Sequence, residues 1–323
     1  MTWAPPGATP VCRSPTSTPE ARGHHNGHLM VDSRTIKLAG LDGVMLAVDI
    51  AGPEDGPNVV LLHGGGQTRH SWAATWATLA EAGWHSWSVD LRGHGDSEWS
   101  RDGDYSLDAF AGDVLAISAA CSSPPILVGA SLGGLASLVA VAEAPIQTDV
   151  ARALVLVDVA HQVEVEGRER IGSFMTQDPD GFASLEEAAD AIAAYNPNRP
   201  RPSNLTGLQK NLRQRGDGRW VWHWDPRFVT GKFGSPDETR SSVINPGRLT
   251  EAVDRLTIPT LLVRGRSSDL LSAEGAQDFL RRAPQAEFAD VAGAGHMVAG
   301  DRNEIFNQAI LGFLDRNRAI KQS

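Results

Sequence analysis

A serine between two glycines is the feature of this chain with the clearest chemistry. Ser131 lies in Gly129-Ala130-Ser131-Leu132-Gly133, after an apolar run and before a segment of small residues. This pattern predicts a strand, a sharp turn and a helix, with the serine hydroxyl projecting from the turn. The flanking glycines leave room for neighbouring backbone, and the helix N-terminus favours negative charge developing near the hydroxyl. We therefore expect Ser131 to be a nucleophile.

A serine nucleophile needs a base, and the base needs a group that orients it. His296 is the expected base, because it follows the last expected strand in a run of small residues that lets the loop approach the sheet edge. Asp269 is the expected acid, because it follows the carboxyl end of an apolar strand, where active sites of parallel sheets lie. Asp158, at the end of the strand before it, is the alternative.

Stabilising the charge on a reacting carbonyl oxygen requires two backbone donors. His63-Gly64-Gly65-Gly66 closes the third expected strand, and its glycines let amides approach a ligand closely. We assign the donors to the amides of Gly65 and Leu132, with Gly64 or Gly66 as alternatives to Gly65. Losing one such donor typically costs about 3–4 kcal/mol of transition-state stabilisation. The residues expected to contact substrate are Gly64, Trp220, Trp222, Trp224 and Met297.

These residues require a sheet that brings the ends of several strands together. Strands alternate with helices along most of the chain, which predicts an α/β protein with a mostly parallel sheet and helices on both faces. The first two strands, separated by residues 39–43, are expected to form an antiparallel hairpin at the edge. The expected strands are Thr35–Leu38, Val44–Ile50, Asn58–Leu62, His85–Asp90, Pro125–Gly129, Ala153–Asp158, Thr257–Val263 and Glu287–Val291. The expected helices lie near Ser71–Glu81, Leu107–Cys121, Leu132–Ala144, Ala273–Arg282 and Asn303–Arg316.

The alternation stops over residues 161–246, which are interpreted as a helical lid inserted into a core of residues 34–160 and 247–323. Short helices are expected at Leu185–Tyr195 and Leu205–Arg215. The lid is acidic in its first half and basic in its second. The basic half is either a solvated face or a surface that attracts an anionic substrate. Residues 1–33, rich in Pro, Ser, Thr, Gly and His, are expected to be a disordered tail and not a secretory signal.

Composition narrows the class of protein. The 323 residues carry a net charge of −10, which disfavours a non-specific nucleic-acid binder. No apolar stretch approaches the roughly 18 residues that cross a bilayer. The two cysteines form no C-x-x-C pair, so structural zinc has little support. We expect a cytoplasmic monomer or homodimer that binds neither membrane nor metal.

Taken together, these motifs resemble those of the α/β-hydrolase superfamily, from about residue 34 to residue 318. The motifs that carry the resemblance are His63–Gly66, Asp90–Ser97, Gly129–Gly133, Gly265–Asp269 and Gly293–His296. The resemblance implies an eight-stranded sheet, a lid after the sixth strand and no cofactor. It also implies that the turn Asp90–Ser97 is mainly structural.

The expected reaction is hydrolysis of a small carboxylic ester through an acyl-enzyme on Ser131. A tryptophan cluster beside arginines suits an aromatic monoester such as a monoalkyl phthalate. Lactonase, perhydrolase and carbon–carbon bond hydrolase activities on the same triad are alternatives, as is a non-catalytic ligand-binding protein. Ser131 disfavours epoxide hydrolases and haloalkane dehalogenases of this fold, which use aspartate. Met297 disfavours the carbon–carbon hydrolases, which usually have tryptophan there.

Overall fold

The site is built on an eight-stranded sheet with strand order β1-β2-β4-β3-β5-β6-β9-β10. The computed structural model describes residues 32–195, 201, 204–230, 245–296 and 303–318. Strand β1 pairs antiparallel with β2, and β2 pairs antiparallel with β4, whereas all other neighbours in this sheet are parallel. The strands are β1 (Ser33–Ala39), β2 (Met45–Ala51), β3 (Asn58–Leu62), β4 (His85–Val89), β5 (Ile126–Ala130), β6 (Ala153–Val157), β9 (Thr260–Gly265) and β10 (Glu287–Val291).

Helices cover both faces of the sheet because its central strands are apolar on both sides. Val60 and Leu62 of β3 pack into one buried cluster, and Val59 and Leu61 pack into another. The first cluster includes side chains of α2 (Leu107–Ala120), α3 (Leu132–Ala142), α8 (Pro246–Asp254) and α9 (Ala273–Arg282). The second includes side chains of α1 (Ala73–Glu81) and α11 (Asn303–Arg316). The short elements η1 (Leu41–Gly43), η2 (Arg69–Trp72) and α4 (Gln147–Val150) complete these layers.

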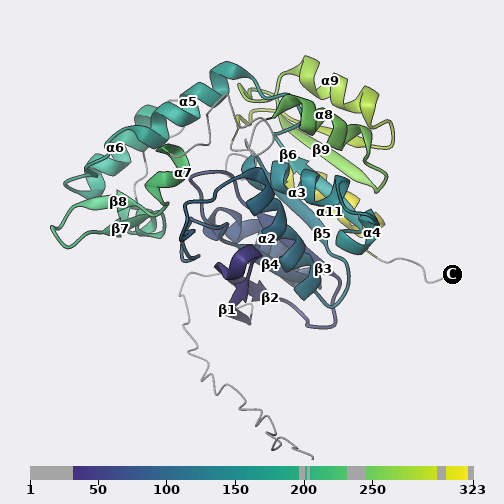
Figure 1. Ribbon diagram of the computed structural model, residues 1–323, viewed down its shortest axis with the longest axis horizontal. Coiled ribbons are helices and arrows are strands. Elements are labelled where there is room, and N and C mark those ends of the chain that lie inside the picture. The colour runs from purple at the N-terminus through teal and green to yellow at the C-terminus, as the bar shows by residue number, and fades with distance from the viewer. Residues whose placement is uncertain (1–31, 196–200, 202–203, 231–244, 297–302, 319–323) are drawn as a thin grey trace, which may run out of the picture. The chain divides into compact units, whose positions relative to one another are not determined.

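The chain between β6 and α8 departs from the alternating pattern, and its described residues between 161 and 245 are called the insertion. Its elements are α5 (Val165–Thr176), α6 (Leu185–Tyr195), η3 (Leu205–Lys210), β7 (Leu212–Gln214), β8 (Trp220–Trp222) and α7 (Pro226–Thr230). Figure 1 shows these elements grouped together to one side of the sheet and its helices. A small buried cluster around Phe182, Leu208 and Leu212 joins α6, η3, β7 and β8, whereas Met175 of α5 and Phe228 of α7 pack into the first cluster of the sheet. The described residues from Asp32 onward nevertheless belong to one compact unit.

The eight expected strands and the edge hairpin are confirmed, with shifts of a few residues at their ends. Within the insertion the helix at Leu185–Tyr195 is confirmed, but the one expected at Leu205–Arg215 is wrong. That stretch contains a short 3-10 helix followed by β7, which pairs with β8. Helices α5 and α8 were not anticipated. Residues 1–31 of the expected tail, and Met297, lie outside the described residues.

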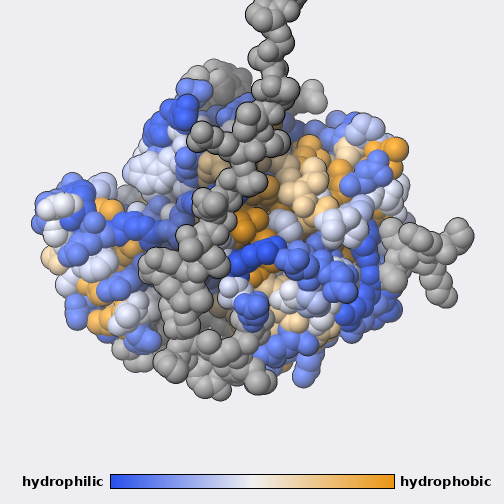
Figure 2. Space-filling view, turned by 90° about the horizontal axis from the view of Figure 1, so that it is seen from below, coloured by the Kyte–Doolittle hydropathy of each residue, from blue (hydrophilic) through white to orange (hydrophobic). Residues whose placement is uncertain are grey.

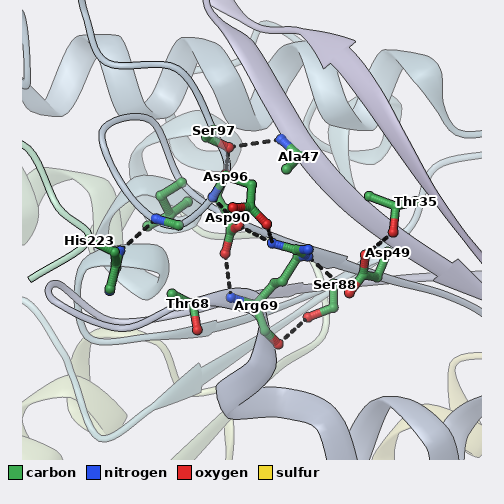
Figure 3. Close-up of polar contacts among 12 residues, drawn as sticks. Thr35, Ala47, Asp49, Thr68, Arg69, Ser88, Asp90, Asp96, Ser97 and His223 are labelled. Carbon is green, nitrogen blue, oxygen red and sulfur yellow. Dashed lines mark hydrogen bonds and ion pairs between the residues drawn. The ribbon is translucent and has the colours of Figure 1, made fainter. Parts of the chain in front are cut away.

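A buried charge network fixes the turn that follows β4 (Figure 3). The Arg69 amide donates to Asp90 Oδ1 over 2.6 Å, and the Arg69 guanidinium forms ion pairs with Asp90, Asp49 and Asp96. The Ser97 hydroxyl donates to the carbonyl of Asp90 over 2.6 Å, which closes the turn Asp90–Ser97 on itself. The turn therefore has a rigid frame, and several of its residues contact the insertion, as described below.

Candidate active site

Ser131 lies at the junction of β5 and α3 in a strained backbone conformation. Its φ and ψ are 46° and −115°, a region that residues with side chains rarely adopt and that is found most often at functional sites. The Ser131 amide donates to the carbonyl of Val157 over 3.2 Å, so the turn is held against the end of the neighbouring strand β6. The serine is half-buried at the carboxyl end of the parallel strands.

The two glycines that flank Ser131 are required by backbone contacts. A Cβ on Gly129 would lie 2.5 Å from the carbonyl oxygen of Gly133, and a Cβ on Gly133 would lie 2.5 Å from that of Leu62. Backbone atoms cannot move aside as a side-chain end can. The tight turn of β5 into α3 therefore depends on both glycines, as the motif implied.

His296 is oriented by Asp158. Its Nδ1 lies 2.7 Å from Asp158 Oδ2, and the Asp158 side chain is completely buried. The amide of Gly265 and the hydroxyl of Ser268 also donate to Asp158, over 2.9 and 2.5 Å. A carboxylate with three donors is well satisfied in its buried site. Because Nδ1 donates to Asp158, the other ring nitrogen of His296 remains available as a base.

Asp269, the acid expected from the sequence, points elsewhere. Its carboxylate forms a two-pronged ion pair with Arg170 of α5, with Nε–Oδ2 and Nη2–Oδ1 distances of 2.7 and 2.9 Å. The reason is the path of the loop after β9. A Cβ on Gly265 would lie 2.2 Å from the carbonyl oxygen of Gly295. The loop that carries His296 (residues 293–296, called the histidine loop) therefore crosses the end of β9 itself. His296 thus meets Asp158 on the adjoining strand, whereas Asp269 has already turned toward the insertion.

The loop Gly64–Gly66 after β3, called the glycine loop, has one amide that donates to no acceptor among the described residues. The Gly64 amide donates to Gln67 Oε1 over 3.0 Å, and the Gly66 amide donates to His94 Nε2 over 3.1 Å. Within the described ranges, the amides of Gly65 and Leu132 have no hydrogen-bond acceptor. A Cβ on Gly64 would lie 3.2 Å from the Cβ of Ser131, so this loop is next to the serine.

Apolar side chains from the insertion cover the glycine loop. A Cβ on Gly65 would lie 3.3 Å from the Phe228 ring, and one on Gly66 would lie 3.2 Å from Met175 and 3.4 Å from Trp224. Trp224 was expected at the site, whereas Met175 and Phe228 were missed. Their contacts join segments far apart in the chain, and no local pattern marks them. The structure therefore places an apolar surface against the glycine loop.

The other two tryptophans differ in their distance from that loop. Trp222 stacks on Trp224, with ring centroids 4.8 Å apart and an interplanar angle of 10°. Trp220 packs against the insertion's own cluster, and its backbone bonds to Phe182. Trp224 therefore contacts the glycine loop, Trp222 packs against Trp224, and Trp220 stabilises the insertion.

The arginines of the basic half of the insertion are already engaged. Each described arginine of this half donates to a carboxylate or to backbone carbonyls. These arginines are Arg201, Arg213, Arg215, Arg219 and Arg227. The face seen in Figure 2 is mainly hydrophilic at its left side, where Figure 1 places β7 and β8. These contacts favour the interpretation of this half as a solvated face over that of an anion-binding surface.

The described residues contain no group of three His, Cys, Asp or Glu side chains arranged to hold a metal ion. None of the described helices has the length and hydropathy needed to cross a membrane.

The chain is similar to known hydrolases in sequence and in structure. The model of the alpha/beta hydrolase family matches residues 59–309. Esterase Rv0045c of Mycobacterium tuberculosis is 31% identical over 267 residues, which cover 80% of this chain and 83% of that protein. A solved structure of that esterase matches with a TM-score of 0.69 and 27% identity, covering 90% of this chain and 93% of that one.

A second relative is named as the hydrolase of a succinate derivative. The 2-(acetamidomethylene)succinate hydrolase of Mesorhizobium japonicum is 28% identical over 234 residues, 71% of this chain and 77% of that protein. An alpha/beta hydrolase from Novosphingobium aromaticivorans matches with a TM-score of 0.74 and 26% identity, covering 89% of this chain and 99% of that one.

Proposed function

Because the chain belongs to the alpha/beta hydrolase family, we propose that it is a serine esterase in which Ser131, His296 and Asp158 form the catalytic triad. The enzyme class, a carboxylic ester hydrolase, agrees with the relatives named as esterase and hydrolase. The observation that carries the triad is the 2.7 Å contact between His296 Nδ1 and the buried carboxylate of Asp158. The Ser131 amide also bonds to the residue directly before Asp158, which draws the serine and the histidine toward one strand end.

The proposed reaction begins with attack of Ser131 Oγ on the ester carbonyl, while His296 Nε2 takes the hydroxyl proton. The proton then passes from His296 to the leaving alcohol as the carbon–oxygen bond breaks. Water, activated by the same nitrogen, attacks the acyl-enzyme and releases the acid. Asp158 keeps the imidazole in the required tautomer and stabilises its charged form.

The amides of Gly65 and Leu132 are the proposed donors to the oxyanion. Their neighbours are committed: Gly64 to Gln67, Gly66 to His94, and the Gly133 amide to the His63 carbonyl over 3.1 Å. Leu132 is the first residue of α3, where an amide has no partner inside its own helix. A carbonyl oxygen that binds both amides lies at the positive end of that helix, as its charge requires.

The proposed substrate is an uncharged ester with an apolar or aromatic group. Met175, Trp224 and Phe228 present hydrocarbon to the glycine loop, whereas the described arginines of the insertion are engaged elsewhere. An ester that carries a free carboxylate, such as a monoalkyl phthalate, is the second candidate. It is favoured by the relative named as the hydrolase of a succinate derivative.

Hydrolysis of p-nitrophenyl butyrate by wild type and Ser131→Ala, purified in parallel, tests the proposal. We expect the variant to lose at least three orders of magnitude in kcat, because the nucleophile is gone. Equal rates in both proteins would refute the assignment of Ser131. Turnover of monobutyl and dibutyl phthalate by the wild type then separates the two substrate classes, with the diester expected to be preferred.

A further inference from the structure

We propose that His94 is a positioning residue for the glycine loop, and that the insertion holds His94 in place through His223 and Phe228. The inference rests on the proposed function, because it concerns the alignment of the Gly65 amide. It assigns a role to a turn that the sequence marked only as structural, and to a histidine of the insertion that no motif singled out.

The hydrogen bonds of His94 define its tautomer. Nδ1 lies 2.9 Å from the carbonyl oxygen of Arg92, which can only accept, so Nδ1 carries the proton. Nε2 is then a lone pair, and it accepts from the Gly66 amide over 3.1 Å. Only the neutral ring makes both bonds. Complete burial lowers the pKa of His94 to about 3, which keeps the ring neutral.

The bond to Gly66 controls the orientation of the amide that remains free. The Gly66 N–H belongs to the peptide plane between Gly65 and Gly66, so holding it restricts the backbone of Gly65. On the other side of that residue, Gln67 holds the Gly64 amide. Glycine has no side chain to restrain such a loop, so these external partners must do so. The bonds to Gly64 and Gly66 therefore limit how far the Gly65 amide can turn.

The insertion binds the residues on both sides of His94. The Gly95 amide donates to His223 Nδ1 over 2.6 Å, and the Asp225 amide donates to the Gly93 carbonyl over 2.9 Å. His223 is almost completely buried. The backbone is therefore hydrogen-bonded to the insertion at the residue before His94 and at the residue after it.

Phe228 of α7 adds a packing contact between the same partners. Its ring meets the His94 ring edge-on, with centroids 4.8 Å apart, and it also lies 3.3 Å from the place of a Cβ on Gly65. One side chain of the insertion thus touches both the positioning histidine and the glycine that carries the free amide. Docking of the insertion and alignment of the oxyanion donor are consequently coupled.

Two His94 variants test the positioning role with p-nitrophenyl butyrate. His94→Phe keeps the ring packing but has no acceptor for Gly66, and we expect kcat to fall about 30-fold to 100-fold with KM changed less than threefold. This loss is smaller than the about 10²-fold to 10³-fold in kcat for a removed oxyanion donor, because the Gly65 amide is misaligned and not removed. His94→Gln offers an amide oxygen near the place of Nε2, and we expect it to restore most of kcat. Wild-type kcat in His94→Phe, or equal losses in both variants, would overturn the inference.

A matched pair at His223 tests the contribution of the insertion and does not depend on the folding of His94→Phe. Asparagine places an oxygen near the position of Nδ1, whereas leucine has no acceptor. We expect His223→Leu to lower kcat about tenfold and His223→Asn to stay within threefold of wild type. Changes confined to KM, or equal losses in both variants, would contradict the coupling. Tryptophan fluorescence and thermal midpoints verify folding.

Ser131→Ala separates the two proposals. If it is as active as wild type, the proposed function fails and the kinetics of the histidine variants carry no meaning for an oxyanion. If it is inactive while His94→Phe and His223→Leu keep wild-type kcat, the esterase assignment stands and only the positioning role is refuted.

Discussion

Asp158 combines three properties that a triad carboxylate needs. It is buried, it is held by Gly265 and Ser268, and its remaining capacity is directed at His296. Its φ of 52° turns the backbone sharply after β6, which tucks the side chain under the histidine loop. Asp269 has none of these contacts, and its ion pair with Arg170 is partly exposed to solvent.

Replacing each aspartate by asparagine discriminates between the two. We expect Asp158→Asn to lower kcat by about 10³-fold to 10⁴-fold, because an amide favours the wrong tautomer of His296. We expect Asp269→Asn to keep kcat within about threefold, because an exposed ion pair contributes about 1 kcal/mol or less. Steady-state hydrolysis of p-nitrophenyl butyrate measures both, and the opposite ranking would restore Asp269 as the acid.

A second residue-scale prediction concerns Gly133. In Gly133→Ala the new methyl group would lie 2.5 Å from the Leu62 carbonyl, so β3 and α3 would have to separate. Overpacking of this kind costs about 1–3 kcal/mol, and a backbone contact belongs at the upper end. Urea unfolding should show the loss. Gly172→Ala, inside helix α5, is the matched control, because a Cβ there has no neighbour within 4 Å, and it should stabilise by up to about 1 kcal/mol.

At the scale of elements, the sequence predicts the sheet far better than the insertion. Central strands such as β3 and β6 are short apolar runs buried on both faces. Such a run can be recognised in the sequence without knowing which strands lie beside it. Strands β7 and β8 have three residues each and exist because they pair with one another. Local residue patterns do not encode such pairing.

The sequence also predicts some residues of the candidate site and not others. Ser131, His296 and the two free amides follow from motifs that fix local backbone, so the sequence could point to them. The choice between Asp158 and Asp269 depends on which strand end the histidine loop crosses, and that path is set by the packing of β9 against residues 293–296. Met175 and Phe228 reach the site only through the fold of the insertion.

Trp224→Ala tests the apolar cover formed by the insertion. Trp224 is 4% exposed, stacks on Trp222 and borders Gly66, so its removal leaves a void beside the glycine loop. We expect kcat/KM to fall about tenfold for p-nitrophenyl butyrate and less for the acetate, because the longer acyl chain has more hydrocarbon to bury. Trp99→Ala is the control, since that side chain is 47% exposed. Equal losses for the two esters would argue against an apolar contact with the acyl chain.

At the scale of the whole molecule, three neighbouring buried histidines link the sheet, the turn after β4 and the insertion. The rings of His63 and His94 lie 5.2 Å apart, and those of His94 and His223 lie 6.0 Å apart. Burial lowers the pKa of His63 to about 4 and that of His94 to about 3, and it holds the pKa of His223 well below its usual range. All three are neutral in the folded protein at neutral pH.

These depressed values predict loss of stability in weak acid. Below pH 6.5 the unfolded chain binds protons at these histidines, whereas the folded chain does not until about pH 4 for His63 and about pH 3 for His94. The free energy of unfolding should therefore be flat above about pH 7 and fall below pH 6.5. Each histidine contributes about 1.4 kcal/mol per pH unit within its window.

Urea unfolding between pH 4.5 and 8 measures this slope. The range lies above the ordinary carboxylate pKa of 3.8, so aspartates whose pKa is lowered, such as Asp96 and Asp225, contribute little to it. His94→Gln removes one of these histidines. The free energy of unfolding should therefore change less steeply with pH, by the contribution of one bound proton. Stability that is constant across the range would show that the histidines titrate normally.

The position of Asp158 has a consequence for recombination with relatives. The insertion begins only a few residues after this aspartate, and α8 begins at Pro246. A chimera joined at residues 161 and 245 would keep Ser131, Asp158 and His296 from one parent. It would exchange, in a single module, both the apolar cover and the His223 clamp on the glycine loop. Substrate preference and turnover should therefore be inherited together from the donor of the module.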